Sequence, residues 1–339
     1  MYDVYGVGNA LVDSEYLVTE AILAESTFPK SGMSLVDEAS RAALLDLIEQ
    51  RHGIQRKALA SGGSAANTIA TVSGLGGKAF YSCKVAGDAT GAFFLRDLST
   101  QGIGCNYDET DCPDGVTGEC ISMITPDGER TLVTHLGITQ NYSPSEIKAA
   151  ALTQSKYLYI EGYLVSSETG FEAALTAQAI AKSAGVPIAL TLSDIGMVQG
   201  FRDQFERLFE AGVDLVFANE DEAMAWTNTA SRDEAASRLA SSPSAFAITL
   251  GGEGALVSGH QGEPKLIPAR SVSPIDTTGA GDTFAGGVLY YLTSGCDLAE
   301  ATARSHPLAA AVVSQYGARL SHDELQTLSA RDRKSTRLN

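Results

Sequence analysis

Short apolar runs alternate with amphipathic segments along most of the chain. The apolar runs predict strands at residues 2–8, 79–85, 157–160, 188–192, 215–218, 245–250 and 255–258. Segments with apolar residues three and four positions apart predict helices at residues 37–50, 168–183, 201–210 and 297–315. Strands that alternate with helices are typical of a mostly parallel sheet covered by helices, so we expect an α/β fold.

Two stretches interrupt this alternation, at residues 11–36 and 104–137. Within the second, residues 118–124 and 130–135 predict two strands joined by a turn that contains Gly128. We expect the two stretches to form a small separate sheet, a lid over the larger α/β body, because such a sheet can exclude water from a site at the strand ends. Body and lid together would make one domain over residues 1–330.

The last residues, 331–339, differ from the rest of the chain. From Asp332 onward they carry one acid and three bases and show no apolar periodicity. We expect this segment to be a non-native tail, similar to a translated sequencing-adapter read-through, and leave it out of the predicted fold.

Charge and composition narrow the classes of partner. The 41 acidic and 24 basic residues give a net charge of −17, which repels nucleic acids and anionic membrane surfaces. With 44% hydrophobic residues the chain should fold, yet no apolar run approaches the roughly 20 residues of a membrane span. The start of the chain lacks the basic flank of a signal peptide, so we expect a cytoplasmic protein. The five cysteines form no CxxC pair, which favours reduced thiols.

The most informative run is DTTGAGDTFAGG at residues 276–287, which leads into a helical pattern. Unblocked amides at a helix N-terminus bind anions through hydrogen bonds and the helix dipole. We expect Gly279, Ala280 and Gly281 to supply such amides. Asp282 would lie beside the anion, where a carboxylate suits a general base that takes a proton from an attacking hydroxyl. The plainer interpretation is a helix-start acid after a tight turn.

Other phosphate-binding and hydrolytic motifs are missing from the sequence. It contains no GxxxxGK[ST] loop, no HRD loop with a DFG partner, no GxSxG and no HExxH. Gly6 and Gly8 form a GxG, but Leu11 stands where a dinucleotide fingerprint needs its third glycine. These absences weaken the dehydrogenase interpretation and leave hydrolase chemistry without a motif.

A second glycine-rich helix entrance is the SGGSAAN run. Gly62 and Gly63 leave the backbone bare, and the Asn67 side chain can donate and accept, which suits a polyhydroxyl ligand. The alternative is a capped helix start with close packing. Asn9 and Asp13 follow the first strand; Asp13 could accept hydrogen bonds from vicinal hydroxyls or be a solvated turn acid.

Two further strand ends carry candidate nucleotide-binding residues. Asn219 and Glu222 could hold magnesium-bound water near phosphates, or simply place acids where they favour a helix dipole. The turn with Thr249, Gly251 and Gly254 could line ribose or phosphate, or be a plain hairpin.

Together and in this order, these segments resemble the ribokinase family of carbohydrate and nucleoside kinases, also called the phosphofructokinase B family. The resemblance spans residues 2 to about 325, with GGSAANTI at 62–69 and DTTGAGDTFAGG at 276–287 as its signatures. It implies a ribokinase-like three-layer α/β/α fold with a mostly parallel central sheet and a small β-sheet lid. It also implies ATP-dependent phosphorylation of a hydroxymethyl group.

The resemblance also implies roles for single residues. Asp282 would be the base and the Gly279, Ala280 and Gly281 amides the anion hole. The nucleotide would lie near Asn219, Glu222, Thr249, Gly251, Gly254 and, close to its adenine, His306, with Mg²⁺ held by Glu222 through water. The sugar-binding positions are Asn9, Asp13, Gly62, Gly63, Asn67 and the strand-end acid Glu161. Asp276 and Thr278 correspond to the place where many members hold a monovalent cation, usually K⁺.

Within the family, GNALVD, YIEGYLV and QYGARL most resemble bacterial proteins described as adenosine kinases. The apolar lid residues Phe28, Met33, Leu35 and Leu136 also favour a base over a bare sugar. We therefore expect transfer of the ATP γ-phosphate to a nucleoside, with the 5'-hydroxyl of adenosine as the first candidate acceptor. We expect the protein to be a monomer or homodimer. The alternatives are a ribose or fructose type of sugar kinase and, from another class, a non-catalytic nucleoside or nucleotide sensor.

Two smaller expectations concern positions near the site. Arg130 in the lid turn is expected to be an exposed hairpin charge, and the alternative is that it approaches substrate or phosphate. His306 precedes Pro307, which makes an odd entry into a helix because proline restricts its predecessor.

Overall fold

A nine-stranded sheet forms the centre of the computed structural model, which describes residues 1–108, 110–260 and 262–336, with side chains up to Ala330. Its strand order is β14-β13-β12-β11-β10-β9-β1-β5-β6. The strands are β1 Tyr2–Val7, β5 Ala79–Ser82, β6 Gly104–Cys105, β9 Ser155–Ile160, β10 Ile188–Thr191, β11 Leu215–Asn219, β12 Ala245–Thr249, β13 Gly254–Ser258 and β14 Lys265–Pro268. From β6 to β12 all neighbours pair in parallel, and β13 and β14 extend the sheet by antiparallel pairing. The mostly parallel sheet is thereby confirmed.

Helices cover both faces of this sheet, because its inner strands are buried on both sides. One face packs against α3 Ser64–Gly74, α4 Ala89–Thr100, α11 Ala280–Thr293, α12 Leu298–Val312 and α13 His322–Thr336. The other packs against α5 Ala149–Leu152, α6 Glu168–Ala184, α7 Ile195–Gly200, α8 Arg202–Ala211, α9 Glu220–Thr227 and α10 Arg232–Ala240. Short 3₁₀ turns occupy η2 Gly137–Asn141, η3 Pro144–Glu146, η4 Gly162–Ser166 and η5 Gly251–Glu253. The result is the expected three-layer α/β/α arrangement.

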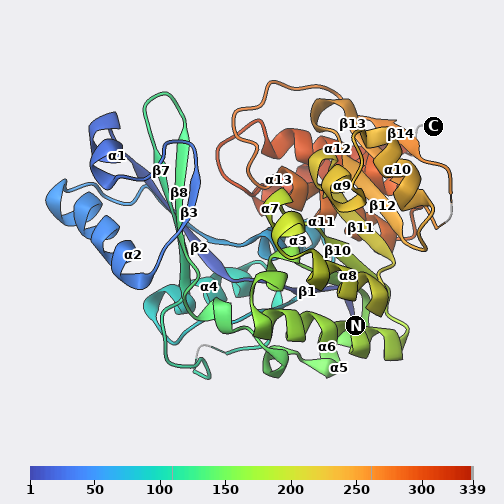
Figure 1. Cartoon of the computed structure of the whole chain (residues 1–339), viewed down its shortest axis with the longest axis horizontal. Helices are drawn as coiled ribbons and strands as arrows, with labels where there is room; N and C mark the ends of the chain where they lie inside the picture. The colour runs from blue at the N-terminus through green and yellow to red at the C-terminus, as the bar shows by residue number, and fades with distance from the viewer. Residues whose placement is uncertain (109, 261, 337–339) are drawn as a thin grey trace.

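A second sheet stands to one side of this body (Figure 1). Its order is β3-β8-β7-β2-β4, with β2 Leu11–Leu17, β3 Met33–Leu35, β4 Ala58–Gly62, β7 Gly118–Ile124 and β8 Arg130–His135. Its outer face packs against α1 Glu20–Ser26, α2 Glu38–Leu45 and a π-helical continuation, η1 Asp46–Arg51. The hairpin β7–β8 has the predicted bounds. The sheet also takes in β4, which the apolar pattern did not predict, while β6 at residues 104–105 pairs with β5 in the large sheet.

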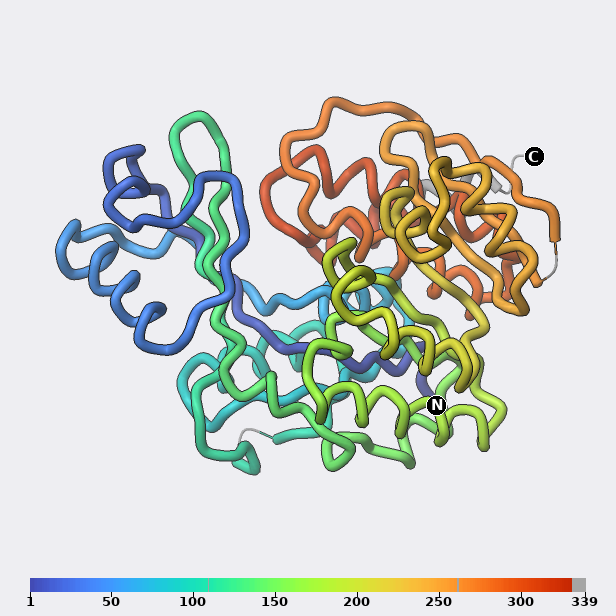
Figure 2. The backbone as a smooth tube through the Cα atoms, in the orientation of Figure 1, coloured from blue at the N-terminus to red at the C-terminus, as the bar shows by residue number. Residues whose placement is uncertain are grey.

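The chain crosses between the two sheets at the positions that the sequence singled out (Figure 2). After β1, residues 8–10 lead into β2, and after β4, Gly63 leads into α3. The candidate residues Asn9, Asp13 and Gly62 therefore lie where the small sheet joins the body.

Two further features of the fold bear on the expectations. Phe28 packs into the core between the small sheet and its helices, so its expected place on a substrate-facing surface is wrong. The backbone of α13 runs on to Thr336, which makes residues 331–336 of the expected tail helical, while 337–339 lie outside the described residues. None of the five cysteines forms a disulfide within the described part of the chain. No helix in the described ranges is long and apolar enough to cross a membrane.

The first prediction concerns the packing of α3 on β1. A methyl group at Gly6 would lie 2.5 Å from Cγ1 of Ile69 on α3, so Gly6→Ala overpacks the core. We expect the free energy of unfolding to fall by about 1–3 kcal/mol, measured by urea denaturation. Gly200→Ala is the matched control, because nothing lies within 4 Å of the added methyl group. Equal stability of both variants would contradict the tight contact.

Candidate active site

The turn into α3 depends on two glycines. Gly63 has a φ of +95°, and a β-carbon there would overlap the carbonyl oxygen of Asn9. A β-carbon at Gly62 would overlap the carboxylate of Asp13. The bare backbone predicted from the GG pair is therefore needed to bring Asn9 and Asp13 against the start of α3.

Glu161 joins three elements at this place. It follows β9 directly, is 1% exposed, and its Oε1 accepts hydrogen bonds from the backbone N (3.3 Å) and Nδ2 (3.2 Å) of Asn9. Its Oε2 accepts from the backbone N of Ala65 in the first turn of α3, at 2.8 Å. Burial outweighs these bonds and raises the pKa of Glu161 to about 7. Glu161 thus lies with the expected sugar-binding residues and holds two of their segments together.

Asp282 connects the starts of α3 and α11. Its Oδ1 accepts a hydrogen bond from Ser64 Oγ (2.6 Å), and its Oδ2 accepts one from Asn67 Nδ2 (2.9 Å). Burial raises the pKa of Asp282, while these two bonds and the charge of Arg319 oppose the rise. The carboxylate faces a cavity of about 90 Å³. Its position between the two helix starts places it beside both groups of candidate residues.

The N-terminus of α11 presents backbone amides to the same region. Gly279 adopts the left-handed conformation (φ +74°), which is required because a β-carbon would overlap the carbonyl oxygen of Ala318. Among the described residues, the N–H groups of Gly279, Gly281 and Asp282 have no protein acceptor. Ala280 differs from its expectation, since its N–H donates to the Thr277 carbonyl at 3.2 Å.

Asn219 and Glu222 form the cap of α9. Asn219 Oδ1 accepts from the backbone N of Glu222 (2.8 Å), and the Glu222 carboxylate accepts from the backbone N (3.0 Å) and Nδ2 (2.7 Å) of Asn219. Burial raises the pKa of Glu222 to about 7. Both residues line the cavity that Asp282 faces. The two residues therefore cap α9 and also lie at the cavity, while their expected place near phosphates stays a prediction.

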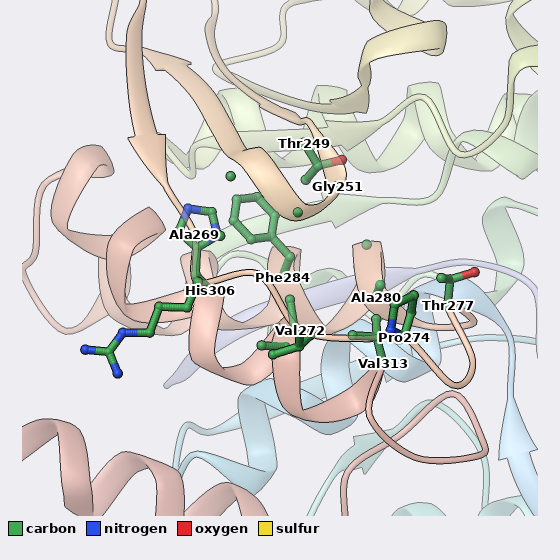
Figure 3. Close-up of a pocket in the computed structure, with 16 residues that line it drawn as sticks. Thr249, Gly251, Ala269, Val272, Pro274, Thr277, Ala280, Phe284, His306 and Val313 are labelled. Carbon is green, nitrogen blue, oxygen red and sulfur yellow. The ribbon is translucent and has the colours of Figure 1, made fainter.

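A larger pocket of about 320 Å³ adjoins this cavity and shares Thr249, Gly281 and Phe284 with it. Its lining includes the expected nucleotide residues Thr249, Gly251, Gly254 and His306 and the apolar residues Val272, Pro274 and Val313 (Figure 3). An apolar pocket with a few polar groups at its edge has the form of a small-molecule binding site.

His306 forms part of one wall of this pocket. Its ring stacks on Phe284 (centroids 5.6 Å apart, 26° between planes), and its Nε2 lies 3.0 Å from the Ile267 carbonyl oxygen. Burial lowers the pKa of His306. The residue lies inside α12, as Pro307 does, so the expected helix entry at this point is wrong.

Asp276 lies beneath the loop, and its oxygens are already engaged. Oδ1 accepts from the backbone N of Thr278 (3.0 Å), and Oδ2 accepts from the backbone N of Gly317 (2.9 Å) and lies 3.2 Å from Nη2 of Arg130. Arg130 also pairs with Glu15 at 3.0 Å, and its side chain is 14% exposed, so the expected exposed hairpin charge is wrong. With a guanidinium and two amides on Asp276, the residues present do not fit a monovalent cation.

Sequence reasoning missed several residues of the site. Arg319 donates from Nε to Asn67 Oδ1 (2.6 Å) and from Nη1 to Ser61 Oγ (2.7 Å). The sequence analysis used the QYGARL run that contains Arg319 only for its resemblance to other proteins and assigned Arg319 no role. Ser193 lines the cavity with Asp282, has a φ of +66°, and its buried Oγ has no partner within the described part of the chain. No local pattern marks either residue, because their roles arise from tertiary contacts.

Comparison with known protein families gives a match over most of the chain. The model of the pfkB family carbohydrate kinases matches residues 39–325. Among curated proteins, the adenosine kinase of Saccharomyces cerevisiae is 27% identical over 328 residues, which cover 92% of this chain and 94% of the relative.

Solved structures give the same picture. The adenosine kinase from Sinorhizobium meliloti is 36% identical, with a TM-score of 0.85 over 98% of this chain and 99% of that one. A probable sugar kinase protein from Rhizobium etli is 34% identical, with a TM-score of 0.85 over 99% of this chain and 98% of that one.

The second prediction uses the raised pKa of Glu161. Between about pH 4.5 and 7 the folded protein keeps a proton that the unfolded chain has released, so stability falls as pH rises through this window. The stability of wild type relative to Glu161→Gln should therefore fall by up to about 3 kcal/mol across the window, measured by urea denaturation. The exposed Glu172→Gln on α6 is the control. A difference that stays constant with pH would contradict the buried titration.

Proposed function

Because this chain belongs to the pfkB family of carbohydrate kinases, we propose that it transfers the γ-phosphate of ATP to a primary hydroxyl of a nucleoside. The first candidate for this acceptor is the 5'-hydroxyl of adenosine. The family consists of phosphotransferases that act on hydroxyl groups. The observation that supports the assignment to this site is the Asp282 carboxylate, which lines the smaller cavity beside Gly281, a residue that both cavities share and whose N–H has no protein acceptor among the described residues.

In the proposed reaction, Asp282 accepts the proton of the acceptor hydroxyl as that oxygen attacks the γ-phosphorus. The hydrogen bonds from Ser64 and Asn67 hold the carboxylate in place, so it needs little reorganisation. The N–H groups of Gly279 and Gly281 donate to the phosphoryl oxygens, where negative charge is concentrated. A loose transition state requires mainly positioning and charge stabilisation, which these groups provide.

The residues of the smaller cavity fit Mg²⁺. Glu222, Asn219 and the unpartnered Ser193 hydroxyl contribute oxygen atoms to its lining, and Mg²⁺ prefers oxygen ligands and keeps several waters. The described residues contain no cluster of three or more His, Cys, Asp or Glu arranged as a direct metal site. Glu222 would therefore hold the ion through water. When bound, Mg²⁺ would neutralise part of the negative charge of the phosphates. No step of the proposed reaction uses a monovalent cation.

The acceptor would lie between the small sheet and α3. Asn9, Asp13 and Asn67 are polar groups suited to sugar hydroxyls, and Met33 and Leu35 leave apolar surface on the small sheet, 56% and 62% exposed. The likeness to adenosine kinases from Sinorhizobium meliloti and Saccharomyces cerevisiae supports a nucleoside acceptor. A free sugar is the second candidate, favoured by the likeness to the probable sugar kinase protein from Rhizobium etli.

The third prediction tests the base. Asp282→Asn removes the proton acceptor but keeps an oxygen for Ser64 or Asn67, so kcat should fall by roughly two to four orders of magnitude while ATP and acceptor still bind. Turnover is measured by coupled ADP release and binding by calorimetry. Asp221→Asn, an exposed acid on α9, is the control. Near-normal turnover of Asp282→Asn would refute the assignment.

The fourth prediction identifies the acceptor. In an ATP-coupled assay with Mg²⁺ across adenosine, inosine, guanosine, ribose and fructose, adenosine should give the highest kcat/KM. Turnover of free sugars alone would favour the sugar kinase. Tight nucleoside binding without ADP release would instead indicate a sensor.

A further inference from the structure

One arginine is buried among the carboxylates of the candidate site. Arg319 follows α12, and its side chain is 15% exposed. Its Nη1 lies 3.6 Å from Oδ2 of Asp97, and its charge also acts on Asp13 and Asp282. Partly buried carboxylates repel one another, and a cation between them offsets this repulsion.

Arg319 also determines which way the amide of Asn67 points. Its Nε donates to Asn67 Oδ1 at 2.6 Å, and Asn67 Nδ2 donates to Asp282 Oδ2 at 2.9 Å. The reversed amide would face the guanidinium with its NH₂ group and the carboxylate with its oxygen, which is unfavourable at both ends. The guanidinium and the carboxylate therefore fix one orientation of Asn67 between them.

The segment that carries Arg319 is fastened to the start of α11. The Gly317 N–H donates to Asp276 Oδ2, and the Ala318 carbonyl oxygen packs so closely against Gly279 that no β-carbon fits there. Arg319 thus has a fixed position relative to the anion-binding amides as well as to Asp282.

We propose that Arg319 is a positioning residue for phosphoryl transfer, which orients Asp282 through Asn67 and balances the charge of the carboxylates around the acceptor. This inference rests on the proposed function, since it assigns a partner to the proposed base. Arg319 acts through Asn67 and need not touch the reacting atoms.

Removing the guanidinium of Arg319 should raise the pKa of Asp282. The groups that act on its carboxylate are Ser64 and Asn67 on α3, Arg319, Asp13 on β2, Tyr159 and Glu161 at β9, and Tyr163 in η4. Without Arg319 the remaining charged neighbours are acids, so the pKa of Asp282 should rise. The acidic limb of the kcat/KM profile should then move to higher pH.

The test compares Arg319→Met, Arg319→Lys and the remote control Arg202→Met, with kcat, KM and the pH profile measured for each. Arg319→Met should lower kcat by about 10- to 100-fold, the usual size for a group that orients a functional residue, and move the acidic limb up by about one unit. Arg319→Lys should keep the limb near that of wild type, because it keeps the charge, but lose kcat, because it lacks the planar fork. Added guanidinium ion should partly restore Arg319→Met, and Arg202→Met should behave as wild type.

Each failure has its own signature. An acidic limb that stays in place in folded Arg319→Met, with ATP binding intact, would overturn the inference. If Arg319→Met does not fold, Arg319→Lys decides, because wild-type kcat in that variant would equally overturn it. Neither result touches the proposed function, which fails only if Asp282→Asn keeps its turnover.

Discussion

The hydrogen bonds of Asp282 to the first turn of α3 are the interaction on which the rest of the candidate site depends. They require the starts of α3 and α11 to meet, although the two segments are more than 200 residues apart in sequence. Small residues make this possible: a β-carbon at Gly286 of α11 would lie 2.5 Å from the Thr68 carbonyl oxygen of α3. Because both helices also pack on the same face of the large sheet, the meeting point is rigid. The free amides, the Asp282 carboxylate and the side chains of Ser64 and Asn67 are thereby held in one place.

The small sheet contributes through its two connections to the body. The link from β1 to β2 carries Asn9, and the link from β4 to α3 is Gly63, which follows Gly62 at the end of β4. Glu161 ties both links together from the end of β9, with hydrogen bonds to Asn9 and to Ala65. The polar part of the proposed acceptor region is therefore anchored to the large sheet, while the exposed Met33 and Leu35 belong to the outlying β3.

Local signals explain which parts of this structure could be predicted from the sequence. Buried parallel strands are continuous apolar runs, so they can be recognised from the local sequence. The loops at Gly63 and Gly279 can be recognised as well, because these residues adopt backbone conformations that favour glycine. The strand β4 was not predicted because it is a short edge strand, and its sequence ALASG has only a weak strand pattern. The roles of Arg130 and Ser193 could not be predicted for another reason. Arg130 is held in place by its ion pair with Asp276, and Ser193 is placed by a strained backbone conformation. Neither feature follows from the neighbouring residues in the sequence.

The chain has a net charge of −17, and yet the proposed site is suited to phosphates. Helix-terminal amides and arginine side chains therefore serve two different purposes in it. Helix-terminal amides attract an anion without adding a titratable group, and they cannot pair permanently with the surrounding acids as a lysine side chain would. The acids then need cations of their own. Arg130 lies against Asp276 and Arg319 lies near Asp13, Asp97 and Asp282, so each arginine is committed to carboxylates of the protein. These pairs offset part of the negative charge of the acids around the glycine-rich loop.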